Sequence, residues 1–306
     1  MNAAQERMYS RKFGVFNHFL FGAPGGSISA DAETDNWNAR VDAFDVQYVA
    51  KTLHEIGAGY YFITLMQGRK YMAAPNAAFD AIAGTKSGEA CARRDLILAL
   101  SDALRPYDID LYLYFTGDGP YKDVECGEKF GFVEPRKHIS LDFCRRWASV
   151  LEEYAVRYGD RVRGWWIDGC YDYFGYDEER LSYYHNAVKR GNPNAMTAMN
   201  NGVKDDLLKW YSGDEFTCGE YNFFDYIPHS RSIDGAQAHI LAPLGLSADG
   251  SPWGGWNRPG CKCTKAELRA YVNRVHDAGG VVTIDFHIRP DCTFDADQLE
   301  VLSGIR

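Results

Sequence analysis

Gly164-Trp165-Trp166-Ile167-Asp168-Gly169 is the stretch of this chain that decides its fold. A short apolar run of this kind is typical of a buried β-strand, and here it ends on an acidic residue followed by glycine. Burying an unpaired charge is costly, so Asp is rare in strand interiors. An Asp at the end of such a strand is instead expected to face an open cleft. Asp168 is therefore the first candidate for a functional residue.

The same layout recurs along the whole chain. Eight segments are short and rich in apolar, β-branched or aromatic residues, as fully buried parallel strands are: 13–19, 60–66, 111–116, 164–168, 196–200, 216–221, 238–244 and 281–286. Helical patterns lie between them, at 45–56, 93–104, 139–158 and 177–189, then after the capping box that opens at Thr264, and from 295 onward. The stretches 223–237 and 247–263 show no helix and are predicted to be long, functional loops.

Strands that alternate with helices indicate an α/β fold with a parallel sheet, and eight such units indicate a closed barrel. We therefore predict a (β/α)8 TIM-type barrel that occupies residues 1–306 as a single domain. No linker or second core interrupts the pattern.

Composition narrows the function. The chain has 306 residues and a formal net charge of −9 with no run of Lys or Arg, which argues against nucleic-acid binding. Its apolar runs are too short to cross a bilayer, and no signal-peptide pattern is visible, so we expect no membrane partner and a cytoplasmic protein. The eight cysteines are expected to be reduced thiols, because their spacing is a poor zinc signature. No metal or organic cofactor is implied.

Aromatic residues are plentiful, with 20 Tyr, 17 Phe and 7 Trp. As a group they suit a pocket that stacks against the apolar face of a sugar. Carbohydrate is therefore the partner that composition favours.

In such a barrel, the carboxyl ends of the strands surround one mouth, where chemistry is done. The predicted strand ends bring the following side chains to it: Asn17, His18, Met66, Gln67, Tyr114, Thr116, Asp168, Asn200, Asn201, Glu220, Asp285 and His287. Two are carboxylates beside aromatic residues, namely Asp168 and Glu220. Paired carboxylates in an aromatic cleft suit glycoside hydrolysis, in which one is nucleophile or base and the other donates a proton to the leaving oxygen.

These residues resemble the α-L-fucosidases of glycoside hydrolase family 29 over nearly the whole chain. Residues 12–18, KFGVFNH, are similar to the family's opening strand, and 166–169, WIDG, are similar to its W-x-D-G nucleophile strand. Residues 217–221, TCGEY, resemble the T-x-E-Y segment that carries the acid/base in one branch. Residues 253–257, WGGWN, and 278–284 match its W-G-Y-N and G-G-N-x-L-L-N regions in placement.

The resemblance implies a retaining exo-glycosidase that removes a terminal L-fucose or a related sugar. It implies that Asp168 is the nucleophile and Glu220 the acid/base, and retention requires carboxyl groups roughly 5–5.5 Å apart. The expected substrate contacts are His18, Asn17, Gln67, Tyr114, Trp165, Trp166, Asn200, Asn201, Tyr221, Trp253 and Trp256. We expect a catalytic barrel without the C-terminal β-sandwich that many members append.

Three alternatives stay open. The second strand lacks the family's adjacent His pair and the fifth lacks its Arg, which favours a glycan-binding barrel without catalysis. A metal-dependent hydrolase would use His18, Asp168, Asp285 and His287, although the sequence has no clustered His. A Schiff-base aldolase is the weakest alternative, because no Lys falls at a convincing strand end.

Overall fold

The core of the molecule is a curled sheet of parallel strands. The computed structural model describes residues 1–21 and 36–305. Within these residues the main sheet has seven strands in the order β5-β4-β3-β2-β1-β9-β8, and every pairing in it is parallel. The strands are β1 (Phe13–Asn17), β2 (Tyr60–Thr64), β3 (Asp110–Thr116), β4 (Gly164–Asp168), β5 (Met196–Met199), β8 (His239–Pro243) and β9 (Val281–Asp285).

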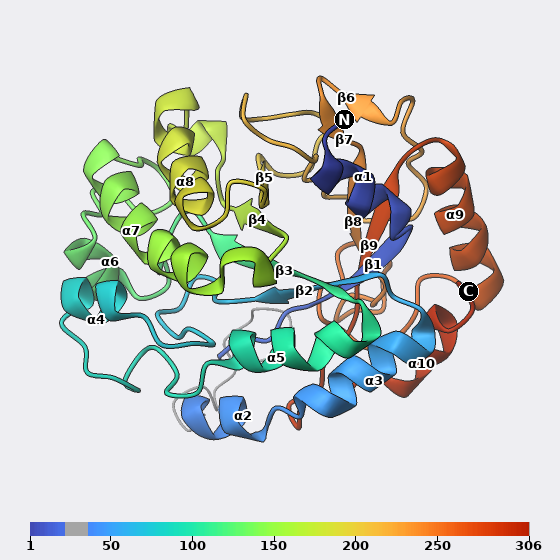
Figure 1. Cartoon of the computed structure of the whole chain (residues 1–306), viewed down its shortest axis with the longest axis horizontal. Coiled ribbons are helices and arrows are strands. Elements are labelled where there is room, and N and C mark those ends of the chain that lie inside the picture. The colour runs from blue at the N-terminus through green and yellow to red at the C-terminus, as the bar shows by residue number, and fades with distance from the viewer. Residues whose placement is uncertain (22–35, 306) are drawn as a thin grey trace.

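Helices surround these strands, as Figure 1 shows. They are α1 (Ala3–Ser10), α2 (Trp37–Ala43), α3 (Val46–Ile56), α4 (Ala77–Ala83), α5 (Leu96–Leu104), α6 (Val124–Lys129), α7 (Leu141–Tyr158), α8 (Glu178–Gly191), α9 (Lys265–Asp277) and α10 (Ala296–Leu302). Short 3-10 turns occupy Arg105–Tyr107, Gly159–Arg161 and Asp172–Phe174. The predicted capping box is present, with the Thr264 side chain and Glu267 at the start of α9. The α/β prediction is confirmed.

The predicted sixth strand, 216–221, needs correction, and a complete eight-stranded barrel is not what the described residues form. The segment joins its neighbours only by isolated parallel bridges, Phe216 to Gln237, which lies just before β8, and Glu220 to Leu241 of β8. The Thr217 hydroxyl replaces part of the backbone ladder, since it donates to His239 O and accepts from His239 N. Gly219 then adopts a φ of +55°, outside the β region. These two features prevent a regular strand.

Side chains of the sheet divide between two cores because successive residues of a strand point to opposite faces. The inner face carries Phe16, Phe62, Tyr112, Tyr114 and Trp166, which form one buried cluster with Met8 of α1. The outer face packs against the helices in a larger cluster. The inside of the curled sheet is therefore a packed aromatic core, and any site has to lie at one of its ends.

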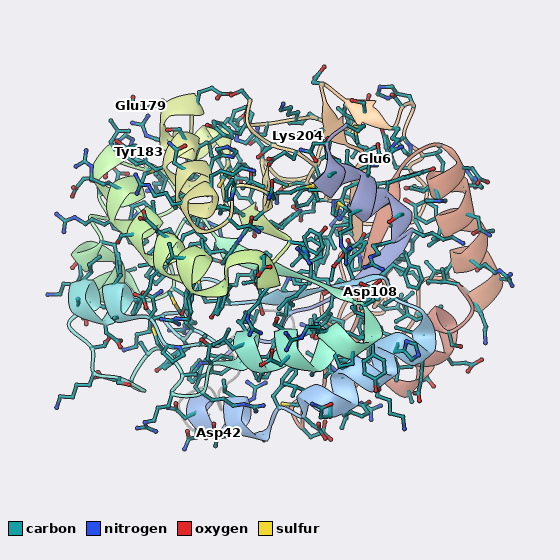
Figure 2. All side chains as sticks on the ribbon, viewed as in Figure 1. Glu6, Asp42, Asp108, Glu179, Tyr183 and Lys204 are labelled. Atoms are coloured by element: carbon teal, nitrogen blue, oxygen red, sulfur yellow. The ribbon has the colours of Figure 1, made fainter. Side chains whose placement is uncertain are left out.

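Helix α1 closes the end where the strands begin. Its Gln5 side chain donates to the backbone oxygens of Glu215 and Gly235. Its Arg7 forms three hydrogen bonds of 2.7–3.0 Å with Asp110, the first residue of β3. Figure 2 labels Glu6 on α1 and Asp108 just ahead of β3. The predicted site residues lie at the opposite end, where the strands finish.

The two stretches predicted as long loops carry no helix. Residues 223–237 end in a small hairpin of β6 (Ser232–Ile233) and β7 (Ala236–Gln237). Residues 247–263 are anchored by Lys262, whose ammonium donates to the backbone oxygens of Asn222 and Gly254. Lys262 thus ties the second loop to the start of the first, whose hairpin reaches α1 through the bond from Gln5 to Gly235 O. In the described part of the chain, no helix is long and apolar enough to span a membrane.

Candidate active site

Strand β4 delivers Asp168 to the strand-end face. It pairs with β3 in a register that sets Trp166 beside Tyr114 and Asp168 beside Thr116. The next residue, Gly169, has a φ of +71°, and a Cβ there would lie 2.5 Å from Asp118 Oδ1. Only glycine fits this turn without displacing a buried carboxyl group. The Asp-Gly pair therefore ends the strand with the carboxylate aimed at the mouth.

Three donors surround the Asp168 carboxylate. The Tyr114 hydroxyl donates to Oδ2 at 2.5 Å, Asn200 Nδ2 donates to Oδ1 at 2.7 Å, and the Tyr171 hydroxyl donates to Oδ1 at 3.5 Å. Hydrogen bonds to a charged carboxylate stabilise the charged form and fix its orientation. The Asp168 carboxyl group is thus held in one orientation at the end of the aromatic core.

Glu220 arrives from the irregular segment that replaces a sixth strand. Its backbone bridges to Leu241 of β8, and its Oε2 accepts a 2.7 Å hydrogen bond from Asn200 Nδ2. Burial and the nearby charge of Asp168 raise the pKa of Glu220 to about 7. A carboxyl group with such a pKa can both give and take a proton near neutral pH.

A pocket of about 150 Å³ opens in front of the two carboxyl groups. It is lined by Phe16, His18, Gln67, Tyr114, Trp166, Asp168, Glu220, Leu241 and Trp256. Its volume is below the roughly 300 Å³ at which sites for drug-sized ligands begin, which suits a single small unit. Rings of Phe16, Tyr114 and Trp166 stack in sequence beneath it, at centroid distances of 5.6 and 5.4 Å.

His18 is held at the pocket by a buried chain of hydrogen bonds. Its Nδ1 lies 2.7 Å from Asp285 Oδ2, and Asp285 Oδ1 accepts from the backbone N–H of Asn257 at 2.6 Å. The Asn257 side chain donates in turn to His18 O at 2.9 Å. Among residues 1–21 and 36–305, no hydrogen bond engages the other ring nitrogen of His18, which can therefore bond a ligand. Trp256, next in sequence to Asn257, meets the His18 ring edge-on at 5.9 Å.

The structure brings most of the predicted site residues together. Asn200 donates a hydrogen bond to each of the two carboxyl groups. The predicted residues that line the pocket are His18, Gln67, Tyr114, Trp166, Asp168, Glu220 and Trp256. Three residues of the site were not predicted from the sequence. Phe16 and Leu241 line the pocket, and the Tyr171 hydroxyl bonds Asp168. Phe16 could have been found from strand alternation, because it lies two residues before His18. Tyr171 lies beyond its strand end, where no sequence signal marks it.

Five of the predicted contacts do not line this pocket. Trp165 is 1% exposed and packs in the outer core, since it alternates with Trp166 along β4. Asn17 is fully buried and bonds Phe286 O and the Tyr61 hydroxyl. Asn201 holds Asp172, on the loop after β4.

The other two are aromatic residues of the neighbouring loops. Tyr221 stacks on Tyr226 with ring centroids 4.6 Å apart and is not part of the lining of this pocket. Trp253 is 65% exposed and meets Phe223 edge-on.

The histidines that the metal-hydrolase alternative would use as ligands form hydrogen bonds to protein groups instead. His18 is bonded to Asp285, and His287 Nδ1 is bonded to Asn257 O at 2.9 Å. Across residues 1–21 and 36–305, no three His, Cys, Asp or Glu side chains are grouped so that they could hold a metal ion.

Comparisons with known proteins come from structure alone. No protein-family model matches the sequence, and no curated protein sequence does either. The fold is similar to that of a bacterial fucosidase solved with a monovalent iminocyclitol inhibitor, at a TM-score of 0.68 and 16% identity, covering 100% of this chain and 74% of that one.

Two further solved structures have a similar fold. An α-L-fucosidase of family GH29 from Bacteroides thetaiotaomicron has a TM-score of 0.67 and 16% identity, with 100% of this chain and 73% of that one covered. The endo-fucoidan hydrolase MfFcnA9 of glycoside hydrolase family 107 has a TM-score of 0.72 and 16% identity, with 100% and 64% covered. The resemblance to fucosidases is therefore matched by the fold, and the chain has the fold of glycoside hydrolases.

Proposed function

We propose that this protein is a retaining glycosidase that cleaves a terminal sugar, L-fucose or a related one. The observation that carries the proposal is the pair Asp168 and Glu220, which share one donor, Asn200 Nδ2, at 2.7 Å each. Their acceptor oxygens can be no farther apart than these two bonds laid end to end. That limit is below the ~6.5 Å at which the separation in inverting enzymes begins, which favours a retaining mechanism.

The roles follow from the surroundings of each carboxyl group. Glu220, with its raised pKa, donates its proton to the glycosidic oxygen while the Asp168 carboxylate attacks the anomeric carbon. The leaving alcohol departs and a covalent glycosyl ester on Asp168 remains. Glu220, now ionised, takes a proton from water, and the resulting attack at the anomeric carbon releases the sugar and restores Asp168.

The substrate class rests on the pocket and on the fold. A 150 Å³ pocket floored by stacked aromatic rings suits one sugar ring lying with its apolar face down. Gln67 and His18 are placed to bond its hydroxyls. The structural neighbours named above act on fucose-containing substrates or carry fucosidase inhibitors, which favours L-fucose or a near relative.

The test is hydrolysis of a panel of aryl glycosides that differ only in the sugar. We expect one or more to be cleaved, with Asp168→Ala and Glu220→Ala each losing about 10²–10⁴-fold in rate. Glu179→Gln is the control, because Glu179 is an exposed acid on the outer helix α8 (Figure 2). Azide should restore turnover to Glu220→Ala and give a glycosyl azide of retained configuration. Near wild-type rates in both alanine variants would refute the proposal, and sugar binding without turnover by the wild type would favour the glycan-binding alternative.

A further inference from the structure

A second group of side chains lies beside Asp168 but outside the pocket. We call Tyr121, Arg136, Tyr171, Tyr173 and Phe174 the arginine–aromatic cluster. The Arg136 guanidinium carbon lies 4.3 Å from the centre of the Tyr121 ring, 5.3 Å from that of Phe174 and 6.0 Å from that of Tyr171. The Tyr171 hydroxyl connects this cluster to the active site through its hydrogen bond to Asp168 Oδ1.

The buried side chain of Asp118 contacts the Arg136 guanidinium. Asp118 follows β3, is 1% exposed, and places its Oδ2 3.4 Å from Arg136 Nε. That oxygen has no hydrogen-bond partner among the described residues, while the Thr116 hydroxyl donates to the other oxygen at 3.2 Å. Burial raises the pKa of Asp118 to about 8, so near neutral pH it is mostly protonated and does not cancel the charge of Arg136. The cluster therefore presents a positive charge to solvent.

The geometry of Arg136 is that of a binding group. Its side chain is 40% exposed, although aromatic rings and Asp118 restrict its rotamers. Its backbone has a φ of +58°, a left-handed conformation that is costly for a residue with a Cβ. Strain of this kind is concentrated at functional positions. A guanidinium that is already held in place loses little entropy when it binds an anion.

Tyr173 adds an exposed flat surface to the cluster. It is 67% exposed, stacks on Tyr171 with ring centroids 5.2 Å apart, and meets Phe174 edge-on at 4.6 Å. A rigid, exposed aromatic ring next to a pocket suits the apolar face of a sugar.

From these observations we infer that the arginine–aromatic cluster is a subsite for a sugar unit carrying a negative charge, beside the sugar that occupies the pocket. The guanidinium of Arg136 binds a carboxylate or sulfate group through paired N–H donors, and Tyr173 stacks on the ring that carries it. The inference rests on the proposed function, since it makes the substrate an acidic glycan and not a neutral one.

Binding to a glycan array tests this without requiring hydrolysis. The array carries neutral glycans, uronic-acid glycans and sulfated glycans, and is probed with labelled full-length wild type, Arg136→Gln and Arg145→Gln. Arg145 is the matched control, because it is a 63% exposed arginine on α7, away from the cluster. We expect wild type and Arg145→Gln to bind charged glycans at least tenfold better than their neutral counterparts. Arg136→Gln should lose that preference. The array also shows whether carboxylate or sulfate is the recognised group.

Two more variants keep the test decisive if Arg136→Gln unfolds. Arg136→Lys keeps the charge but loses the planar fork, and should bind charged glycans several-fold more weakly than wild type. Tyr173→Ala removes an exposed ring and should weaken the binding of neutral and charged glycans to the same extent. Three outcomes would overturn the subsite. They are equal binding of charged and neutral glycans by the wild type, equal effects of Arg136→Gln and Arg145→Gln, and no glycan binding at all. Arg136-dependent binding in a protein that cleaves no glycoside would uphold the subsite and refute the glycosidase.

Discussion

Asp168 and Glu220 both accept a hydrogen bond from the same atom, Asn200 Nδ2, at 2.7 Å each. The orientation of this amide is fixed, because its Oδ1 accepts from the backbone N–H of Gly202 at 3.0 Å. One side chain therefore sets the spacing of the two carboxyl groups, although they lie on segments more than fifty residues apart. It also leaves each carboxylate within the electric field of the other.

Replacing Tyr114 with Phe should slow catalysis without disturbing the fold. The substitution removes the 2.5 Å hydrogen bond to Asp168 Oδ2 but keeps the ring in the inner core. A hydrogen bond to a charged group contributes about 1.5–3 kcal/mol, so kcat should fall roughly 10–100-fold. Tyr112→Phe is the control, since it makes the same change one layer deeper in β3. Steady-state kinetics on an accepted glycoside measures both, and equal effects would contradict the role of Tyr114.

The pH dependence of activity should follow Glu220. Its proton is needed in the first step, and the protonated fraction falls as pH rises through a pKa of about 7. We therefore expect kcat/KM to decline above about pH 7. In Asp168→Asn the negative charge that helps raise this pKa is gone, so the pKa of Glu220 should move downward.

Carbon-13 NMR titration of the glutamate carboxyl groups would measure that shift. Asp172→Asn serves as the control, because Asp172 is an exposed acid that does not contribute to the shift of Glu220. An unchanged or higher pKa in Asp168→Asn would show that the two carboxyl groups are not coupled.

Gly219→Ala should damage both stability and activity. Gly219 has a φ of +55°, and an added Cβ would lie 1.9 Å from His239 O, so the chain next to Glu220 must move. We expect a loss above about 2 kcal/mol in the free energy of unfolding and a large drop in kcat. Gly235→Ala is the matched control, with a φ of +87° but open space around it, and should cost only about 1 kcal/mol. Urea unfolding compares the two, and similar losses would argue against a steric constraint at Gly219.

Asp110→Ala should loosen α1 from the closed end of the sheet. Asp110 is 4% exposed and accepts hydrogen bonds from both Arg7 and Arg11. Arg7 is 39% exposed and can be solvated once Asp110 is gone, so the loss should be about 1.5–3 kcal/mol, the range for hydrogen bonds between charged groups. Asp160→Ala, at an exposed acid on the same face, should change the free energy of unfolding by less than about 0.5 kcal/mol. Thermal unfolding of both variants tests this, and equal melting temperatures would mean that the Arg7–Asp110 contact adds no stability.

Local patterns in the sequence determined the elements and the chemistry. The apolar run ending at Asp168 specifies a strand and its last residue, and the capping box at Thr264 specifies where α9 begins. Both signals are contained within a few residues, so no distant contact can override them easily. The pairing of an acid with aromatic residues likewise indicated sugar chemistry before any fold was known.

Tertiary structure decided what depends on residues far apart. Trp165 and Trp166 are equally apolar, so the sequence shows that they alternate but not which one faces the pocket; packing against the helices settles it. The 216–221 segment has strand composition, yet its contacts with His239 replace a regular ladder. The meeting of Asp168 with Glu220 is of the same kind, because only the curling of the sheet brings their segments to one amide nitrogen.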